Sequence, residues 1–403
     1  MSADHPDAPL PASSPVSEVF WAFLKLGVTS FGGPVAHLSY FRAEFVQRRQ
    51  WLDENAYADI VALCQFLPGP ASSQVGITIG LLRAGFAGAF MAWLGFTFPS
   101  AVALIAFAYG IGDLGDLSHV AWLHGLKIVA VAVVAQAVWG MAKNLCPDRT
   151  RASLAVAAAV LALALPSATG QIGAIVAGGL FGWLFLPGEA DKRFLPLATP
   201  VRRSQAIAAS LIFAVLLIGL PLLAQASGTH ALALFASFFR SGALVFGGGH
   251  VALPLLQQAV VPQGWIGDDS FLAGYGAAQA VPGPLFTFAA FLGAAMKQAP
   301  NGWIGGLLCL AAIFLPSFLL LVAALPFWDA LRQRAGVQAA LKGVNAAVVG
   351  ILLGALYTPV WTSAIFSAKD FCLGLVAFLL LTYWKTPPWL VVVLGAVAAA
   401  ALA

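Results

Sequence analysis

The sequence predicts an all-α polytopic membrane protein built from two inverted-topology repeats, each with two re-entrant helical hairpins followed by transmembrane helices. Three observations lead to this fold class. The 403 residues are 61% apolar and 9% charged, far from the roughly half apolar and quarter charged composition of soluble domains. The chain matches itself at an offset of about 215 residues. Gly- and Pro-containing breaks recur at matching positions of the two copies. This composition excludes a soluble nucleic-acid binder and makes the lipid bilayer the solvent.

We divide the chain into four parts. Residues 1–15 carry no Lys or Arg, so they are interpreted as a disordered cytoplasmic tail and not as a signal peptide. Residues 16–187 form the first repeat, and residues 231–403 form the second. Between them, residues 188–230 supply a basic cytoplasmic linker and a connecting transmembrane helix, expected at about Gln205 to Ala224.

The internal repeat is carried by unusual residues in the same order. In the first copy these are Phe31-Gly32-Gly33, Gln65, Pro68-Gly69-Pro70 and Phe98-Pro99-Ser100; in the second they are Phe246-Gly247-Gly248, Gln279, Pro282-Gly283-Pro284 and Leu315-Pro316-Ser317. Because a Gln three residues before Pro-Gly-Pro occurs in both copies, between the same neighbours, the match indicates a duplication and not a chance alignment of glycines.

The apolar runs around each Phe-Gly-Gly and Pro-Gly-Pro are too short to cross a bilayer. About 14 residues of helix extend roughly 21 Å, whereas the hydrocarbon core is about 30 Å thick. Each pair of runs is therefore expected to form a re-entrant hairpin, with its exposed backbone surrounded by protein or water. We expect the four tips to meet near the membrane midplane. The count is about nine full spans plus four hairpins, or thirteen apparent spans.

Charge placement then gives the topology. If the hairpins return to their own side, only Lys297 and Lys369 are separated from the other Lys and Arg of the loops. The larger set is Arg42, Arg48, Arg49, Arg83, Lys143, Arg149, Arg151, Lys192, Arg193, Arg202, Arg203, Arg332, Arg334, Lys342 and Lys385. The positive-inside rule makes this side cytoplasmic.

The same rule predicts that the two repeats are inverted. The loop with Arg48 and Arg49 lies inside, whereas the matching loop with Asp268 and Asp269 lies outside. The loop with Asp113 and Asp116 is also placed outside. The N-terminus is then cytoplasmic and the C-terminus periplasmic. Inverted repeats with broken helices at the midplane are a recurring plan of secondary transporters, which makes a transporter the leading class.

Two cations occupy the same repeat position near the tips. Lys25 and Arg240 each lie six residues before a Phe-Gly-Gly, about 9 Å along a half-helix. A cation inside the membrane is costly unless it is paired, and no acid recurs at a matching position. An anionic substrate is therefore a natural partner. The alternative is that both side chains extend to the interface.

The tips themselves are suited to an oxyanion. A helix is expected to begin after each Pro-Gly-Pro, so free N–H groups and the positive end of its dipole would face the tip. Ser72, Ser73 and Thr287 would lie in those first turns, with Gln65 and Gln279 beside them. The candidate binding residues are Lys25, Arg240, Gly32, Gly33, Gly247, Gly248, Gln65, Gln279, Pro68, Gly69, Pro70, Ser72, Ser73, Pro282, Gly283, Pro284 and Thr287. The alternative is that the hydroxyls only cap helices and the amides only hold the hairpins together.

Four further polar residues are candidates for proton transfer or gating. His37 and His250 lie just beyond the two Phe-Gly-Gly segments, where each could carry a proton or simply bridge helices. Lys127 is a third cation within a predicted span. Asp59 is the acid nearest to a tip and a candidate partner for one of these cations.

No sequence motif indicates an enzyme, a metal or a cofactor. The chain lacks HExxH and Ser-His-Asp patterns, and the four cysteines are far apart, with no CxxC pair and no His at ligand spacing. A passive anion channel remains the alternative to a transporter, since it would also use cationic tips. Oligomeric state stays open, with a homodimer as one possibility.

These motifs resemble the chromate ion transporter family in its long form with two homologous halves. The resemblance extends from about Val16 to Leu381. The segments that carry it are Phe31-Gly32-Gly33-Pro34 with His37, Leu67-Pro68-Gly69-Pro70, Phe98-Pro99-Ser100, Phe246-Gly247-Gly248-Gly249-His250, Gln279-Ala280-Val281-Pro282-Gly283-Pro284, Leu315-Pro316-Ser317 and Gly343-Val344-Asn345-Ala346-Ala347-Val348.

The resemblance implies a secondary transporter that exports chromate from the bacterial cytoplasm across the inner membrane. It also implies that the proton motive force drives this antiport and that the activity confers chromate resistance. Sulfate is a similar dianion, so sulfate or another small oxyanion is the alternative substrate.

Overall fold

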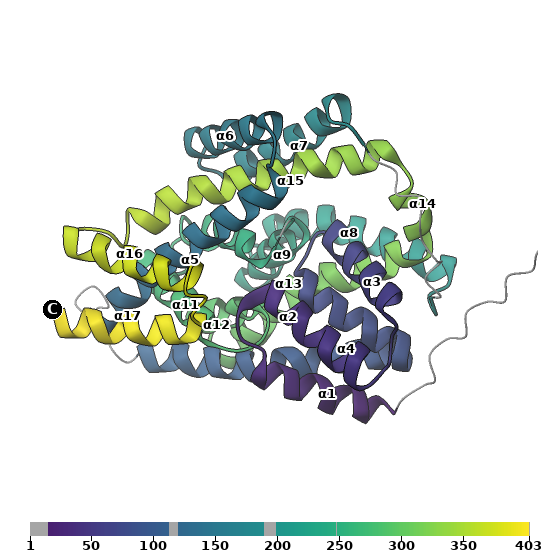
Figure 1. The fold of residues 1–403 in the computed structure, drawn as a ribbon, viewed down its shortest axis with the longest axis horizontal. Coiled ribbons are helices and arrows are strands. Elements are labelled where there is room, and N and C mark those ends of the chain that lie inside the picture. The colour runs from purple at the N-terminus through teal and green to yellow at the C-terminus, as the bar shows by residue number, and fades with distance from the viewer. Residues whose placement is uncertain (1–14, 113–119, 189–198, 247, 403) are drawn as a thin grey trace, which may run out of the picture.

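The structure is a computed structural model that describes residues 15–112, 120–188, 199–246 and 248–402. Within these residues every regular element is a helix (Figure 1). The tail up to residue 14, Asp113, Asp116, Lys192, Arg193 and Gly247 lie outside the described residues. The all-α part of the predicted fold class is therefore confirmed for the described chain.

The described residues of the first half form the helical elements α1 to α7. Their bounds are α1 Val16–Thr29, α2 Gly33–Phe41 with a π-helical extension Arg42–Arg48, α3 Glu54–Phe66, α4 Ala71–Gly112, α5 Ala121–Leu145, α6 Arg149–Ala164 and α7 Ala168–Phe185. The helix α8, Arg203–Ser227, then connects the halves, at the place where the sequence predicts the connecting span.

The second half repeats this order with more interruptions. Its elements are α9 His230–Ala243, a 3₁₀ turn Gly249–Val251, α10 Ala252–Val260, α11 Asp268–Ala280, a 3₁₀ turn Leu285–Thr287, α12 Phe288–Ala294, α13 Gly302–Ala324, a 3₁₀ turn Leu325–Phe327, α14 Trp328–Arg332, α15 Ala335–Ala355 with a π-helical extension Leu356–Trp361, α16 Ala368–Thr382 and α17 Pro388–Leu402.

The long helix α4 is two helices that fold back on each other. Ala84 and Gly85 have non-helical backbone angles, and Gly85 has φ of 63°. A Cβ atom on Gly80 would lie 2.4 Å from the carbonyl oxygen of Gly88, although residues eight apart in a straight helix are separated by about 12 Å. The same contact recurs between Gly293 of α12 and the Gly305 carbonyl oxygen of α13, at 2.2 Å. The chain therefore reverses direction at the matching place in each half.

Six helices are long and apolar enough to cross a membrane among the described residues: α4, α5, α7, α8, α13 continued to Arg332 and α15 continued to Trp361. The protein is therefore a multi-pass membrane protein. The helices α6, α16 and α17, with 16, 15 and 15 residues, fall short of the roughly 20 residues that span a bilayer. The count of nine full spans stays a prediction.

The two halves exchange their last helices. In Figure 1, α6 and α7 lie against α15 of the second half, and α16 and α17 lie beside α5 of the first half. Glycines allow this close packing, because a Cβ on Gly343 would lie 2.0 Å from the carbonyl oxygen of Gly178 and a Cβ on Gly125 would lie 2.5 Å from that of Gly395. These contacts are reciprocal, since Gly125 matches Gly343 in the repeat and Gly178 matches Gly395.

Candidate functional site

The four predicted tips are all breaks between short helices. The helix α1 ends at Thr29 and α2 begins at Gly33; α3 ends at Phe66 and α4 begins at Ala71. In the second half, α9 ends at Ala243 before the turn Gly249–Val251, and α11 ends at Ala280 before the turn Leu285–Thr287. The helix α4 therefore begins directly after the first Pro-Gly-Pro, as the sequence predicts, whereas a 3₁₀ turn separates the second Pro-Gly-Pro from α12.

Glycine is needed in these breaks because the backbone turns into the left-handed region. Gly69 has φ of 129° and Gly283 has φ of 97°, values that side-chain-bearing residues rarely adopt. Gly32 and Gly248 also have positive φ, of 101° and 141°. Backbone geometry thus explains the matched pair Gly69 and Gly283, before any role in binding is considered.

The tips join across the two halves in reciprocal pairs. The N–H of Gly69 donates to the carbonyl oxygen of Val245 at 2.6 Å, and the N–H of Gly283 donates to that of Ser30 at 3.0 Å. Ser30 and Val245 occupy matching repeat positions, as do Gly69 and Gly283. Each Pro-Gly-Pro tip therefore binds the Phe-Gly-Gly tip of the opposite half, as in a two-fold symmetric interface.

A second reciprocal contact surrounds this junction. A Cβ on Gly69 would lie 2.6 Å from the hydroxyl oxygen of Ser317, and a Cβ on Gly283 would lie 2.9 Å from that of Ser100. Ser100 and Ser317 follow the matching prolines of α4 and α13. The recurring Pro-Ser pairs thus place a hydroxyl beside the tip of the opposite half, a role that sequence spacing did not assign to them.

The two tips of the first half are lined by buried polar groups, several of which have unsatisfied hydrogen-bonding atoms. His37 Nδ1 lies 3.3 Å from the Ser72 hydroxyl, whereas His37 Nε2, the Ser73 hydroxyl and the Gln74 Oε1 atom are buried without a hydrogen-bond partner. Gln74 Nε2 donates to the carbonyl oxygen of Pro68 at 2.7 Å. Buried polar groups are normally satisfied, so this cluster is suited to a polar ligand.

The two tips of the second half carry different polar side chains. His250 Nδ1 lies 2.8 Å from the Tyr275 hydroxyl, and Gln279 Nε2 is buried without a partner. The hydroxyl of Thr287 donates to the carbonyl oxygen of Pro284 at 2.7 Å, so Thr287 closes its own turn. The repeat therefore preserves the backbone of the junction but not its side chains.

Sequence reasoning missed Gln74 and Tyr275. Both lie within about one helical turn of a predicted residue, Gln74 directly after Ser73 and Tyr275 four residues before Gln279. A Gln one position beyond the capping hydroxyls of a helix that starts at a Pro-Gly-Pro was an available signal for the first. The contact between Tyr275 and His250 joins residues of different helices and had no sequence signal.

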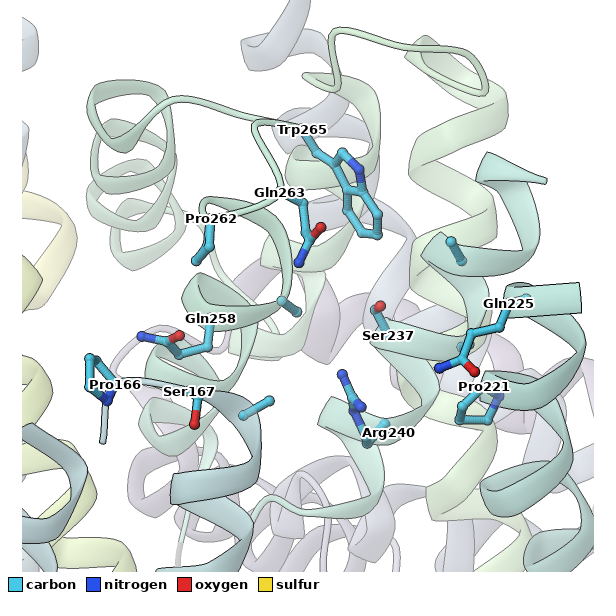
Figure 2. A pocket seen from close by; sticks show the side chains of 15 residues that line it. Pro166, Ser167, Pro221, Gln225, Ser237, Arg240, Gln258, Pro262, Gln263 and Trp265 are labelled. Atoms are coloured by element: carbon cyan, nitrogen blue, oxygen red, sulfur yellow. The ribbon is translucent and has the colours of Figure 1, made fainter. Parts of the chain in front are cut away.

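The two matched cations are in different surroundings. Lys25 is exposed on α1, and Gln65 is exposed on α3. Arg240 is partly buried on α9 and lines a cavity of about 450 Å³, into which its guanidinium points (Figure 2). The repeat position is thus shared, but the surroundings are not.

The remaining charged candidates form ion pairs between the halves. Lys127 Nζ lies 2.8 Å from an oxygen of Asp269, and its side chain is 5% exposed. Asp59 does not pair with Lys25, Arg240 or Lys127; it accepts from Arg332 at 3.0 Å, a residue that the sequence marked only as a topology signal. The sequence could not show this contact because 273 residues separate the two partners.

The described part of the chain contains no group of three or more His, Cys, Asp or Glu side chains placed to hold a metal ion. What the site offers is hydroxyl, amide, imidazole and backbone N–H groups around helix starts. Such groups suit hydrogen bonding to the oxygens of an anion.

The chain matches known proteins along most of its length. The family model for the chromate transporter matches twice, over residues 17–183 and 232–400. A chromate transport protein of Pseudomonas aeruginosa is 31% identical over 353 residues, which cover 85% of this chain and 80% of that protein. A probable chromate transport protein of Synechococcus elongatus is 27% identical and is matched over 93% of each chain. An uncharacterized transporter of Methanocaldococcus jannaschii is 27% identical, over 94% of this chain and 92% of that protein. No solved structure matches.

The fold and the site define a multi-pass membrane protein with a duplicated core of broken helices, an arrangement typical of secondary transporters. The chain belongs to the chromate transporter family, in its long form with two homologous halves. The family is one of transporters.

Proposed function

We propose that the protein is a secondary active transporter that exports chromate across the bacterial inner membrane by alternating access and thereby confers chromate resistance. The observation that carries this proposal is the reciprocal hydrogen bonding of the tips, Gly69 with Val245 and Gly283 with Ser30. A junction formed by two matching halves can exchange their conformations and expose one site to each side in turn. Chromate is proposed as the substrate because relatives of this chain are named chromate transport proteins.

The proposed substrate site is the junction itself. The free N–H groups at the start of α4, with Ser73 and Gln74, would bind the oxygens of the dianion. Ser72 would hold the His37 ring, and His37 would take up or release a proton as the site changes side. In the second half, Gln279 would bind the anion, and His250 with Tyr275 would line the side of the site that matches His37 and Ser72.

Contacts support the proposed inverted topology. Groups assigned to the cytoplasmic side lie together: Lys342 Nζ donates to the carbonyl oxygen of Pro187, which directly precedes the linker assigned to that side, at 2.9 Å. On the proposed outer side, Lys127 pairs with Asp269. The N-terminus would then be cytoplasmic and the C-terminus periplasmic.

Chromate uptake into everted membrane vesicles, with and without an imposed proton gradient, tests the proposal. We expect saturable uptake that the gradient accelerates, and competition by excess sulfate would measure how well the site separates the two dianions. Vesicles without the protein are the control. Uptake equal to that control under both conditions would contradict chromate as the substrate.

A further inference from the structure

The cavity that Arg240 lines is walled by helices of both halves and by the connecting helix α8. Its volume is about 450 Å³, compared with about 30 Å³ per molecule in liquid water. Figure 2 shows Arg240 pointing into it from α9, with Gln225 and Pro221 of α8 on one side and Ser167 and Gln258 on the other. There is room for a tetrahedral oxyanion and part of its hydration shell.

The walls of this cavity suit an anion. The groups that line it offer amide, hydroxyl and indole donors, from residues such as Gln225, Ser237 and Trp265, and the described lining includes no Asp or Glu. Within the part of the chain that the structure describes, the guanidinium of Arg240 has no carboxylate within ion-pairing distance. A partly buried cation without a fixed counter-ion attracts mobile anions from solution.

Arg240 also lines a second, smaller cavity on the tip side. About 10 Å³ of space, close to one water molecule, lies between Arg240, Gln171 and Leu244. Leu244 directly precedes Val245, which accepts the hydrogen bond from Gly69. The Oε1 atom of Gln171 is buried without a partner. Arg240 thus lies between the large cavity and the tip junction.

The connecting helix α8 gives Arg240 a wall that the matching Lys25 lacks. Pro221, Ala224 and Gln225 of α8 form one wall, and α8 has no counterpart in the repeat. Lys25 occupies the position that matches Arg240 but is exposed on α1. The repeat therefore contains two matched cations, and the unmatched helix α8 forms a wall beside only one of them.

We propose that the Arg240 cavity is an outer anion site, in which a small tetrahedral dianion is held by Arg240 between the tip junction and the periplasm. The proposal rests on the proposed transport function and on the outer placement of the loop with Asp268, which follows Trp265 closely in the chain. It gives the two halves different roles, because release on the outer side passes a partly buried cation in a cavity and loading on the inner side passes an exposed one.

Cysteine labelling tests this assignment directly. In a protein with Cys146 and Cys372 replaced by Ser, the remaining native thiols, Cys64 and Cys309, are buried. Ser237→Cys and Gln225→Cys then place single thiols on two different walls. Ser227→Cys, at the exposed end of α8, is the matched control. Each variant is labelled from the outer side with membrane-impermeant methanethiosulfonates, one anionic and one cationic.

We expect both cavity thiols to react from outside, with an anionic-to-cationic rate ratio roughly tenfold above that of Ser227→Cys, in line with electrostatic steering. Adding Arg240→Gln should return the ratio to the control value, and Arg240→Lys should keep most of it. Sulfate should slow labelling more than chloride at equal ionic strength, which separates binding from screening. Sulfate is the probe because chromate oxidises thiols.

Cavity thiols that cannot be reached from outside, or a rate ratio that Arg240→Gln leaves unchanged, would overturn the outer anion site. The two proposals fail separately. Chromate uptake without any effect of charge on labelling would leave transport intact and reject the site. An Arg240-dependent preference for anions in a protein that moves no chromate would keep the site and reject the substrate.

Discussion

Single glycines at the two Pro-Gly-Pro tips allow the backbone to make the cross-half hydrogen bonds. Gly69 and Gly283 both have strongly positive φ, and a Cβ atom on them would lie only 2.6 Å and 2.9 Å from a serine hydroxyl of the opposite half. Adding a methyl group would strain the backbone by about 1–3 kcal/mol and push the serine away.

We therefore expect Gly69→Ala and Gly283→Ala each to lower chromate uptake strongly, and together more than either alone. Gly173→Ala is the matched control, because its Cβ would meet nothing within 4 Å and alanine is the better helix former. Uptake into vesicles, normalised to the amount of folded protein, is the measurement. Normal uptake in both tip variants would show that the junction tolerates a side chain and is not the site of transport.

The buried pair of Asp59 and Arg332 is the second residue-scale feature with a measurable consequence. The two side chains are 8% and 5% exposed, and removing one partner of a buried pair typically costs about 3–5 kcal/mol. Since Arg332 also contacts Asp329, we expect Asp59→Asn to cost less than this.

Thermal unfolding in detergent would measure the loss, with the double variant Asp59→Asn, Arg332→Gln as the test of coupling. We expect the double variant to be more stable than the sum of the two single losses predicts. Strict additivity would mean that the pair contributes no interaction energy between the halves.

The sequence indicated many of the residues near the junction, but it did not indicate which residues they contact. The glycines, Ser72, Ser73 and both histidines were found because repeat spacing and helix-start chemistry are local signals. The contact of His250 with Tyr275 and the pairing of Asp59 with Arg332 join distant segments, and no local rule predicts such contacts. Lys25 and Arg240 were treated as equivalent because the repeat cannot show that α8 covers only one of them.

At the scale of elements, helix breaks were predictable but helix partners were not. Short apolar runs around Gly and Pro indicated the four tips, and all four are breaks between helices. Charge placement assigned Arg83 to the cytoplasmic side, but the sequence did not predict the reversal at Ala84 and Gly85. Gly85 allows that reversal by adopting φ of 63°, whereas hydropathy alone would give a single long helix.

We predict that the two halves have inverted orientations in the membrane. Gln47 lies in the π-helical extension of α2 and Asp268 begins α11, and both side chains are exposed. We expect thiols introduced as Gln47→Cys and Asp268→Cys to be labelled from opposite sides by an impermeant reagent, the first only from the cytoplasm. Labelling of both from one side would contradict the inversion.

At the scale of the whole molecule, the halves are interlocked and not merely adjacent. The exchange of α6 and α7 against α16 and α17 could not be predicted, because glycine spacing shows that a helix face is closely packed without showing which helix packs on it. A consequence is that neither half has its full set of neighbours alone. Any change at the junction must move helices of both halves together.

Chromate counterflow measures whether one site of the protein is exposed to each side of the membrane in turn. Reconstituted vesicles are loaded with unlabelled chromate and diluted into a trace of radiolabelled chromate. An alternating-access carrier predicts a transient accumulation of label above its equilibrium level, because outward-moving chromate returns the site to face the label. A steady approach to equilibrium without this overshoot would contradict alternating access and indicate a passive channel.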